Sequence, residues 1–179
     1  MTGRLMTLWH RGAAAAELGR RITAGRSGTI VHRYSVNGGE DRLLWVETQD
    51  GGFEQMKEDL PAGEIFTFDL ARDVGVAALS PPPWLYIVHT DIPADVVDDY
   101  NAWYDQEHLP RLVTVPGVDR ARRYVATGEL RPRYLTAYDL SIKDAFETPQ
   151  GLVARKTPWT ERMRALFQNT RRKMCTLQT

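Results

Sequence analysis

Three consecutive prolines at positions 81–83 divide this chain of 179 residues nearly in half. Proline fixes φ and lacks a backbone N–H, so a run of three continues neither a helix nor a central strand. Such a run instead favours a short, stiff polyproline linker. We therefore predict two units, residues 1–80 and residues 84–179, joined by the linker at 81–83.

The second half shows the clearer pattern of secondary structure. Runs of β-branched and aromatic residues predict strands, and Gly- and Pro-containing stretches predict the turns between them. A longer segment that follows Asp91 and Pro93 predicts a helix. The predicted elements are a strand at 84–90, a helix at 94–109, strands at 118–126 and 133–140, a helix at 159–168 after a loop at 148–158, and a weak strand at 173–177.

The first half can be interpreted in the same order. Its predicted elements are a strand at 5–10, a helix at 13–22, strands at 29–36 and 41–48, a helix at 53–60 and a strand at 65–70. Both halves then follow the β-α-β-β-α-β order of a ferredoxin-like unit, which predicts an α+β protein. The tripeptide at 32–34, HRY, also matches RRY at 122–124, so we interpret the chain as an internal duplication.

One segment of the second half carries groups that suit proton transfer. Tyr100, Tyr104 and His108 are four residues apart, so a helix places them on one face, with Trp103 beside them. Imidazole titrates near pH ~6.5 and can both give and take a proton. The alternative is a helix C-cap, because Pro110 is expected to end or kink the helix and a terminal histidine interacts well with the helix dipole. The first half has no counterpart of this segment, which predicts one equipped pocket per chain.

The strand predicted at 118–126 carries arginines on both faces. Side chains alternate along a strand, so Arg122 and Tyr124 point one way and Arg123 the other. Arginine can hold a carboxylate through two hydrogen bonds, although an ion pair with Asp119 or Asp139 is the alternative. The predicted catalytic residues are His108, Tyr104 and Arg123. The predicted substrate-binding residues are Arg122, Tyr124, Tyr100, Trp103, His89 and Tyr134, of which the tyrosines, Trp103 and His89 can equally be core residues.

Composition excludes several other classes of function. The formal net charge is zero, with 23 basic and 23 acidic residues, so no overall field favours nucleic acid or an anionic membrane. A net charge of zero is also compatible with a homo-oligomer. The single cysteine, Cys175, rules out an intramolecular disulfide and a cysteine-based zinc cluster. No apolar run approaches the ~20 residues of a membrane span, and no signal peptide is evident, so a cytoplasmic protein is expected.

The sequence predicts no metal and no cofactor. The four histidines lack HxH or HxxxH spacing, and no GxGxxG, P-loop or GxSxG motif is present. Haem binding through one of the histidines stays open as an alternative. The expected partner is a small-molecule substrate.

The segment WYDQEHLPRLVTVPGVDRARRY at 103–124, followed by PRYLTAYDL at 132–140, resembles the EthD-like group of the dimeric α+β barrel superfamily. The resemblance covers roughly residues 85–140. It implies two ferredoxin-like sheets packed face to face into a barrel, built here from one chain. His108 matches the motif histidine, Tyr104 the aromatic residue before it, and Arg123 with Tyr124 the R-Y pair.

The superfamily includes cofactor-free monooxygenases, lactone isomerases, polyketide cyclases, decarboxylases and haem enzymes, so the fold does not choose a reaction. The leading hypothesis is a cofactor-independent lyase, most simply a decarboxylase, of a small aromatic or unsaturated carboxylate. Arg122 or Arg123 would hold the carboxylate, and His108, assisted by Tyr104, would protonate the carbon that develops negative charge. The alternatives are a cofactorless monooxygenase or an isomerase/cyclase of an aromatic or polyketide-like substrate, and a non-catalytic metabolite-binding protein.

Overall fold

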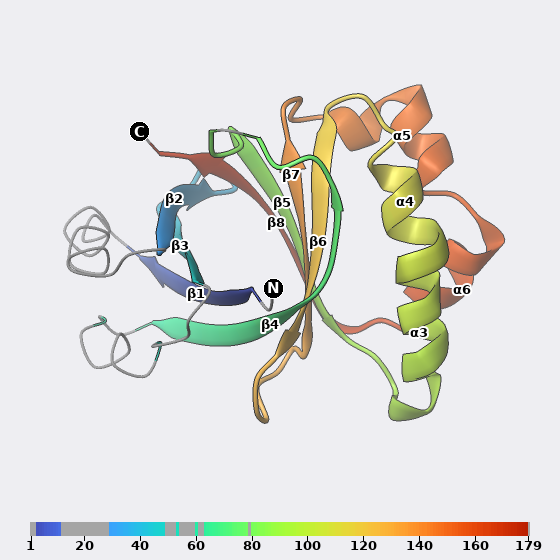
Figure 1. The fold of residues 1–179 in the computed structure, drawn as a ribbon, viewed down its shortest axis with the longest axis horizontal. Helices are drawn as coiled ribbons and strands as arrows, with labels where there is room; N and C mark the ends of the chain where they lie inside the picture. The colour runs from blue at the N-terminus through green and yellow to red at the C-terminus, as the bar shows by residue number, and fades with distance from the viewer. Residues whose placement is uncertain are drawn as a thin grey trace.

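The computed structural model describes residues 3–11, 29–48, 53, 60, 63–78 and 80–178. Within these residues, eight strands form one closed barrel, and every neighbouring pair of strands is antiparallel (Figure 1). The strands are β1 Arg4–Arg11, β2 Ile30–Val36, β3 Asp41–Thr48, β4 Glu64–Gly75, β5 Trp84–Asp91, β6 Val118–Ala126, β7 Tyr134–Leu140 and β8 Gln168–Leu177. Closure leaves no strand edge open to another chain.

The two halves of the chain contribute four adjacent strands each, in the same relative order. The order around the barrel is β4-β1-β3-β2 and then β8-β5-β7-β6. The second strand of each half therefore pairs with the fourth strand of the other, at the β2–β8 and β4–β6 seams. The strand order therefore confirms the predicted α+β class and the predicted barrel.

The predicted helices of the first half, at 13–22 and 53–60, lie outside the described residues apart from Phe53 and Leu60. A complete ferredoxin-like unit in that half, and the division of the chain into two units at residues 81–83, therefore stay predictions.

Helices cover only the outer face of β5–β8 among the described residues (Figure 1). They comprise the 3-10 turn η1 Ala94–Val96, α3 Val97–Trp103, the π-turn η2 Tyr104–His108, α4 Leu109–Leu112, the 3-10 turn η3 Ala145–Glu147, α5 Pro149–Ala154 and α6 Pro158–Ala165. Helix α5 lies where a loop was expected. The Thr148 hydroxyl caps it by accepting a hydrogen bond from the Gly151 N–H at 3.1 Å, and Pro149 suits its first turn.

The helix that carries His108 does not end at Pro110, contrary to the sequence-based expectation. The Leu109 N–H bonds the Tyr104 carbonyl five residues earlier, which makes the turn Tyr104–His108 a π-turn. Pro110 then lies in the first turn of α4, where its missing N–H is not required, and the helix continues to Leu112.

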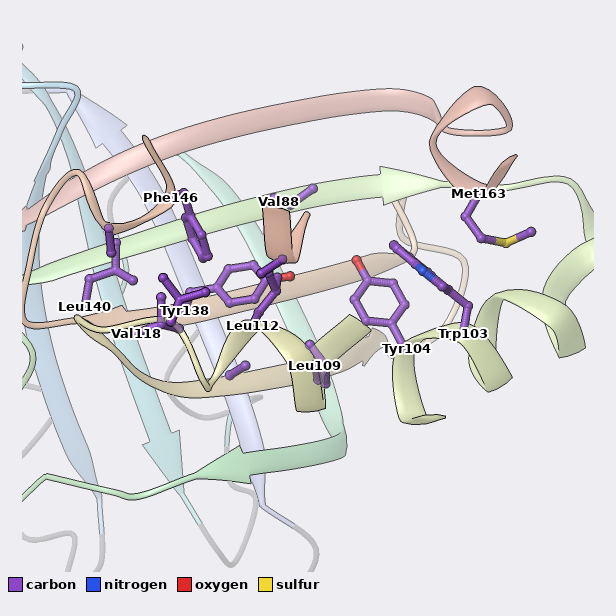
Figure 2. Packing of buried hydrophobic residues seen from close by; sticks show 14 of the residues in the cluster. Val88, Trp103, Tyr104, Leu109, Leu112, Val118, Tyr138, Leu140, Phe146 and Met163 are labelled. Atoms are coloured by element: carbon purple, nitrogen blue, oxygen red, sulfur yellow. The ribbon is translucent and has the colours of Figure 1, made fainter. Parts of the chain in front are cut away.

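Alternation along the strands separates the barrel interior from the apolar clusters on its outer face. The barrel interior is filled by large side chains such as Tyr34, Trp45 and Phe68. The outer face of β5–β8 packs against the helices through a second cluster, in which Trp103 and Tyr104 on the helix meet Val88 and Tyr138 on the strands (Figure 2). A residue's place in the strand pattern therefore decides whether its side chain enters the barrel interior or packs on the outer face.

Gly117, in the turn before β6, is expected to tolerate no side chain. Its φ is +89°, and a Cβ built there would lie 2.5 Å from the Cβ of Ile142. Gly117→Ala should therefore lower the free energy of unfolding by about 2–4 kcal/mol, from backbone strain plus overpacking. Gly128→Ala is the matched control, because Gly128 also has positive φ but nothing lies within 4 Å of its Cβ position. Equal losses for the two variants in chemical denaturation would contradict the packing argument.

Candidate functional site

A cavity of about 230 Å³ lies between the helical layer and the outer face of β5, β7 and β8, and we call it the helix–sheet cavity. Three predicted site residues, Trp103, Tyr104 and His108, line it. Its other walls are largely aromatic and aliphatic, and three arginines complete it. The aromatic walls include Tyr86, Tyr138, Phe146 and Phe167, and the arginines are Arg155, Arg164 and Arg172.

His108 is buried, with 5% of its surface exposed, and faces this cavity. Its Nδ1 atom has no hydrogen-bond partner among the described residues. Burial lowers the pKa of His108 to about 3, and the charges of Arg164, Arg111 and Arg155 add to the effect. The imidazole is therefore neutral near pH 7, and the helix continues beyond it, so the structure does not support the helix-cap alternative.

The π-turn brings Trp103 and His108 onto the same face of the helix. Their ring centroids lie 4.1 Å apart at an interplanar angle of 28°, although the residues are five positions apart. The Trp103 indole N–H in turn donates a hydrogen bond to the Thr160 hydroxyl of α6 at 3.2 Å. His108 is thus held by stacking on an anchored indole. The neighbouring carboxylate of Glu107 does not hold the ring, since it accepts a hydrogen bond from Thr157.

Tyr104 lies edge-on to His108, with ring centroids 5.3 Å apart. Its hydroxyl oxygen accepts a hydrogen bond from the Thr136 hydroxyl of β7 at 3.0 Å. Burial raises the pKa of Tyr138 well above its ordinary value. That phenol stays protonated near pH 7, and its hydroxyl is hydrogen-bonded with Tyr104.

The three arginines make one side of the cavity positive. Arg155 donates to the Phe146 carbonyl at 2.7 Å and lies 3.3 Å from the Glu147 carboxylate. Arg164 and Arg172 are exposed and have neither an ion pair nor a hydrogen bond within the described part of the chain. Burial and the neighbouring Arg155 lower the pKa of Arg164, as expected for cations that repel each other. The cavity therefore suits an anion with an aromatic body.

Arg123 lies behind Tyr104 rather than in the wall of the cavity. Its guanidinium donates to the Asn101 side-chain oxygen at 2.5 Å. It also lies 4.7 Å, 4.9 Å and 5.2 Å from the ring centroids of Tyr100, Tyr104 and Tyr134. These cation–π contacts stabilise the aromatic layer that carries Tyr104. Arg123, Tyr100 and Tyr134 thus support the site from the layer behind it.

Arg122, Tyr124 and His89 lie on the other side of the sheet, in the barrel interior. Arg122 donates to Asp139 at 2.5 Å and also pairs with Glu47. The alternative ion pair with Asp139 is therefore confirmed. The structure does not bring these three predicted substrate-binding residues together with His108.

Tyr86, Tyr138 and the three arginines were not among the residues predicted from the sequence. Strand alternation would have found Tyr138, which lies two and four residues beyond Thr136 and Tyr134 on the same face of β7. The run Arg171-Arg172-Lys173 is the corresponding signal in β8, which begins at Gln168 rather than at residue 173. No sequence signal places Arg155 and Arg164 beside His108, because they come from different helical elements.

Acid should destabilise this protein partly through His108. The unfolded chain binds a proton at this residue below pH ~6.5, whereas the native state binds it only near pH 3. Between these values the unfolded state holds more protons, so stability falls as pH falls, by about 1.4 kcal/mol per pH unit. Urea denaturation from pH 6 to pH 4.5 should therefore show a shallower pH dependence for His108→Gln than for the wild type. Parallel curves would show that His108 is protonated in the native state.

The helix–sheet cavity is small for haem, the alternative that the sequence left open. A hollow of about 230 Å³ lies below the ~300–1,000 Å³ typical of ligand pockets, and a haem needs more room than a small ligand does. Across the described ranges, no three His, Cys, Asp or Glu side chains are placed to hold a metal ion. None of the described helices is long and apolar enough to span a membrane.

Known proteins resemble this chain in structure but not in sequence. No protein-family model and no curated protein matches the sequence. A monooxygenase-like protein from Listeria innocua superposes with a TM-score of 0.70 at 11% identity, over 99% of this chain and 94% of the other. An anthrone oxidase-like protein gives 0.68 at 12% identity, over 99% and 92%. A mutant chlorite dismutase from Candidatus Nitrospira defluvii gives 0.70 at 11% identity, over 99% and 91%. These likenesses show that the chain shares the α+β fold of these proteins.

Proposed function

We propose that this protein is a cofactor-independent monooxygenase that oxidises a small phenolic or anthrone-like substrate in the helix–sheet cavity. The observation that carries the proposal is a neutral, buried His108 with an unpartnered ring nitrogen, facing an aromatic cavity bordered by Arg164 and Arg172, which have no ion pair among the described residues. The neighbours described as monooxygenase-like and anthrone oxidase-like add support, because the same fold houses them. They favour this alternative over the decarboxylase hypothesis.

The residues suit the first step of such a reaction. His108 removes a proton from the substrate, and the resulting electron-rich anion lies beside Arg155, Arg164 and Arg172. Binding of the anion also offsets the positive charges that lower the pKa of His108, so the imidazole becomes a stronger base when the substrate is present.

The reaction needs no external reductant. The substrate anion gives electrons to O₂, and the two combine at carbon to form a peroxide. For an anthrone, loss of water from the peroxide converts the ring CH₂ group and O₂ into a C=O group and H₂O, with all four electrons supplied by the two C–H bonds. For a phenol, the ring C–H and the O–H group supply the electrons and the product is a quinone and H₂O. In both cases one oxygen atom stays on carbon and the other leaves as water.

Arg164 and Arg172 also suit a carboxylate, so a lyase is the second candidate. Oxygen uptake separates the two. The purified protein, treated with EDTA and given no flavin, should consume one O₂ per substrate when offered phenols and anthrones of one to three rings. Release of CO₂ from hydroxybenzoates without oxygen uptake would contradict the monooxygenase proposal and support the lyase hypothesis. If the protein binds both the phenols or anthrones and the hydroxybenzoates but converts neither, the non-catalytic metabolite-binding protein is the remaining hypothesis.

A further inference from the structure

A second cavity, of about 510 Å³, opens at one end of the barrel, and we call it the barrel-end cavity. It lies on the opposite face of the sheet from the helix–sheet cavity. Alternation along β5 shows the separation, since Val88 lines the helix–sheet cavity whereas Ile87 and His89 line the barrel-end cavity. In β8, likewise, Arg172 borders the first and Lys173 the second. The proposed monooxygenase reaction uses none of these barrel-end residues.

His89 is a buried polar group without a full set of partners in this cavity. Only 3% of its surface is exposed, and its ring makes T-shaped contacts with Phe66 and Phe68, with centroids 4.8 Å and 5.5 Å away. Its Nε2 atom has no hydrogen-bond partner among the described residues. A buried polar atom left without a partner costs about 1–3 kcal/mol, so such an atom beside a cavity points to a ligand.

The environment of His89 determines which kind of group can form a hydrogen bond with Nε2. The ring bonds the backbone of Pro132, and a proline backbone offers only a carbonyl, so the ring donates there through Nδ1–H. Burial lowers the pKa of His89 to about 4, so the ring is neutral near pH 7. A neutral ring that donates from Nδ1 carries a lone pair on Nε2. The partner that this atom lacks is therefore a donor, such as a hydroxyl.

Cationic side chains line the rim of the cavity, and among them Arg42 donates to the Gly39 and Asp41 carbonyls. Arg11 pairs with Asp41 at 3.2 Å, and Arg171 pairs with Glu64 at 2.8 Å. Lys173 is half-buried and has no ion pair or hydrogen bond to any residue that the structure describes. An unpaired ammonium group beside an apolar wall favours a carboxylate ligand.

The apolar part of the wall comes from three strands. Trp9 of β1, Val36 of β2 and Ile87 of β5 line the space that also holds His89 and Lys173. A ligand that suits this lining therefore has an apolar body, a carboxylate for Lys173 and a hydroxyl for His89.

We propose that the barrel-end cavity is a second small-molecule site, which binds an amphipathic hydroxy acid. The carboxylate contacts Lys173, the apolar body packs on Trp9 and Ile87, and the hydroxyl donates a hydrogen bond to Nε2 of His89. The site is independent of the reaction proposed for the helix–sheet cavity, so either can fail without the other.

Calorimetric titration with 8-hydroxyoctanoate, octanoate and 1,8-octanediol tests the proposal. The hydroxy acid should bind with one-to-one stoichiometry and more tightly than either control, since each control lacks one of the two polar groups. Lys173→Met should weaken binding of 8-hydroxyoctanoate by about tenfold or more. His89→Phe should reduce its affinity to that of octanoate. Absence of binding by the wild type would overturn the proposal.

Arg164→Met is the matched control, because Arg164 borders only the helix–sheet cavity of the two. Binding that depends on Arg164 and not on Lys173 would place the acid in the helix–sheet cavity and overturn the proposal. Thermal unfolding checks that each variant folds. If His89→Phe does not fold, the ¹⁵N chemical shift of His89 Nε2 is measured in the wild-type protein instead. That shift should move upfield when 8-hydroxyoctanoate is added, and an unchanged shift at saturation would exclude the hydroxyl contact.

Discussion

Replacing His108 with alanine should lower kcat for the oxygen-consuming reaction by about 10²–10⁴-fold, the usual contribution of a general acid or base. The expectation rests on the neutral ring and the unpartnered Nδ1 of His108 in the helix–sheet cavity. A steady-state assay with an oxygen electrode measures the change. The affinity for substrate should change less than kcat, because the aromatic walls and arginines remain.

His32→Ala is the matched control for this prediction. His32 lies on β2, which belongs to the other half of the barrel, and does not line the helix–sheet cavity. Its variant should keep the wild-type kcat. Turnover of His108→Ala within a few-fold of the wild type, with a lowered thermal midpoint, would make His108 a packing residue and remove the proposed base.

Arg122→Met should lower the free energy of unfolding by about 3–5 kcal/mol, because it leaves two carboxylates inside the barrel without their counter-ion. Arg122 is 3% exposed and pairs with Glu47 and Asp139. Burial raises the pKa of Asp139, whereas Arg122 and the Trp45 N–H hold that of Glu47 below its ordinary value against the effect of burial. Urea denaturation at pH 7 measures the loss.

Arg120→Met is the control, since Arg120 is two positions away on the same face of β6. Its ion pair with Asp73 is partly exposed, with 21% and 35% of the two side chains accessible. Removing it should cost about 1 kcal/mol or less. The triple variant Glu47→Gln, Arg122→Met, Asp139→Asn should recover much of the loss, because no buried charge remains. A single variant Arg122→Met as stable as the wild type would contradict the buried-charge argument.

Several elements were predictable because they depend on neighbours in sequence. The strands predicted at 41–48 and 118–126 agree with β3 and β6, since alternating apolar residues and turn-forming flanks suffice to define them. The weak prediction at 173–177 missed the first half of β8, because a polar run such as Asn169–Arg172 resembles a loop until another strand pairs with it. Pairing of β8 with β5 along most of its length supplies what the local sequence lacks.

The candidate site, like the fold, was predictable from the sequence only where it depends on neighbouring residues. Local spacing was enough to place Tyr104 and His108 together, because both belong to one helix. The stacking of Trp103 on His108 was not predictable, since it depends on a π-turn that an α-helical pattern does not contain. The ion pair that holds Arg122 also depends on Glu47, which is far away in sequence.

The sequence by itself determined the α+β class, the order of most strands and the position of His108 on an aromatic helix, because periodicity and turn chemistry act over a few residues. Only the tertiary structure decided the order in which the eight strands pair around the barrel and that Arg122, rather than Arg123, faces its interior. It also decided that Arg155, Arg164 and Arg172 border the cavity of His108 and that His89 faces a different one. The physical reason is that these properties depend on which distant strands and helices pack together, and burial and charge act through space rather than along the chain.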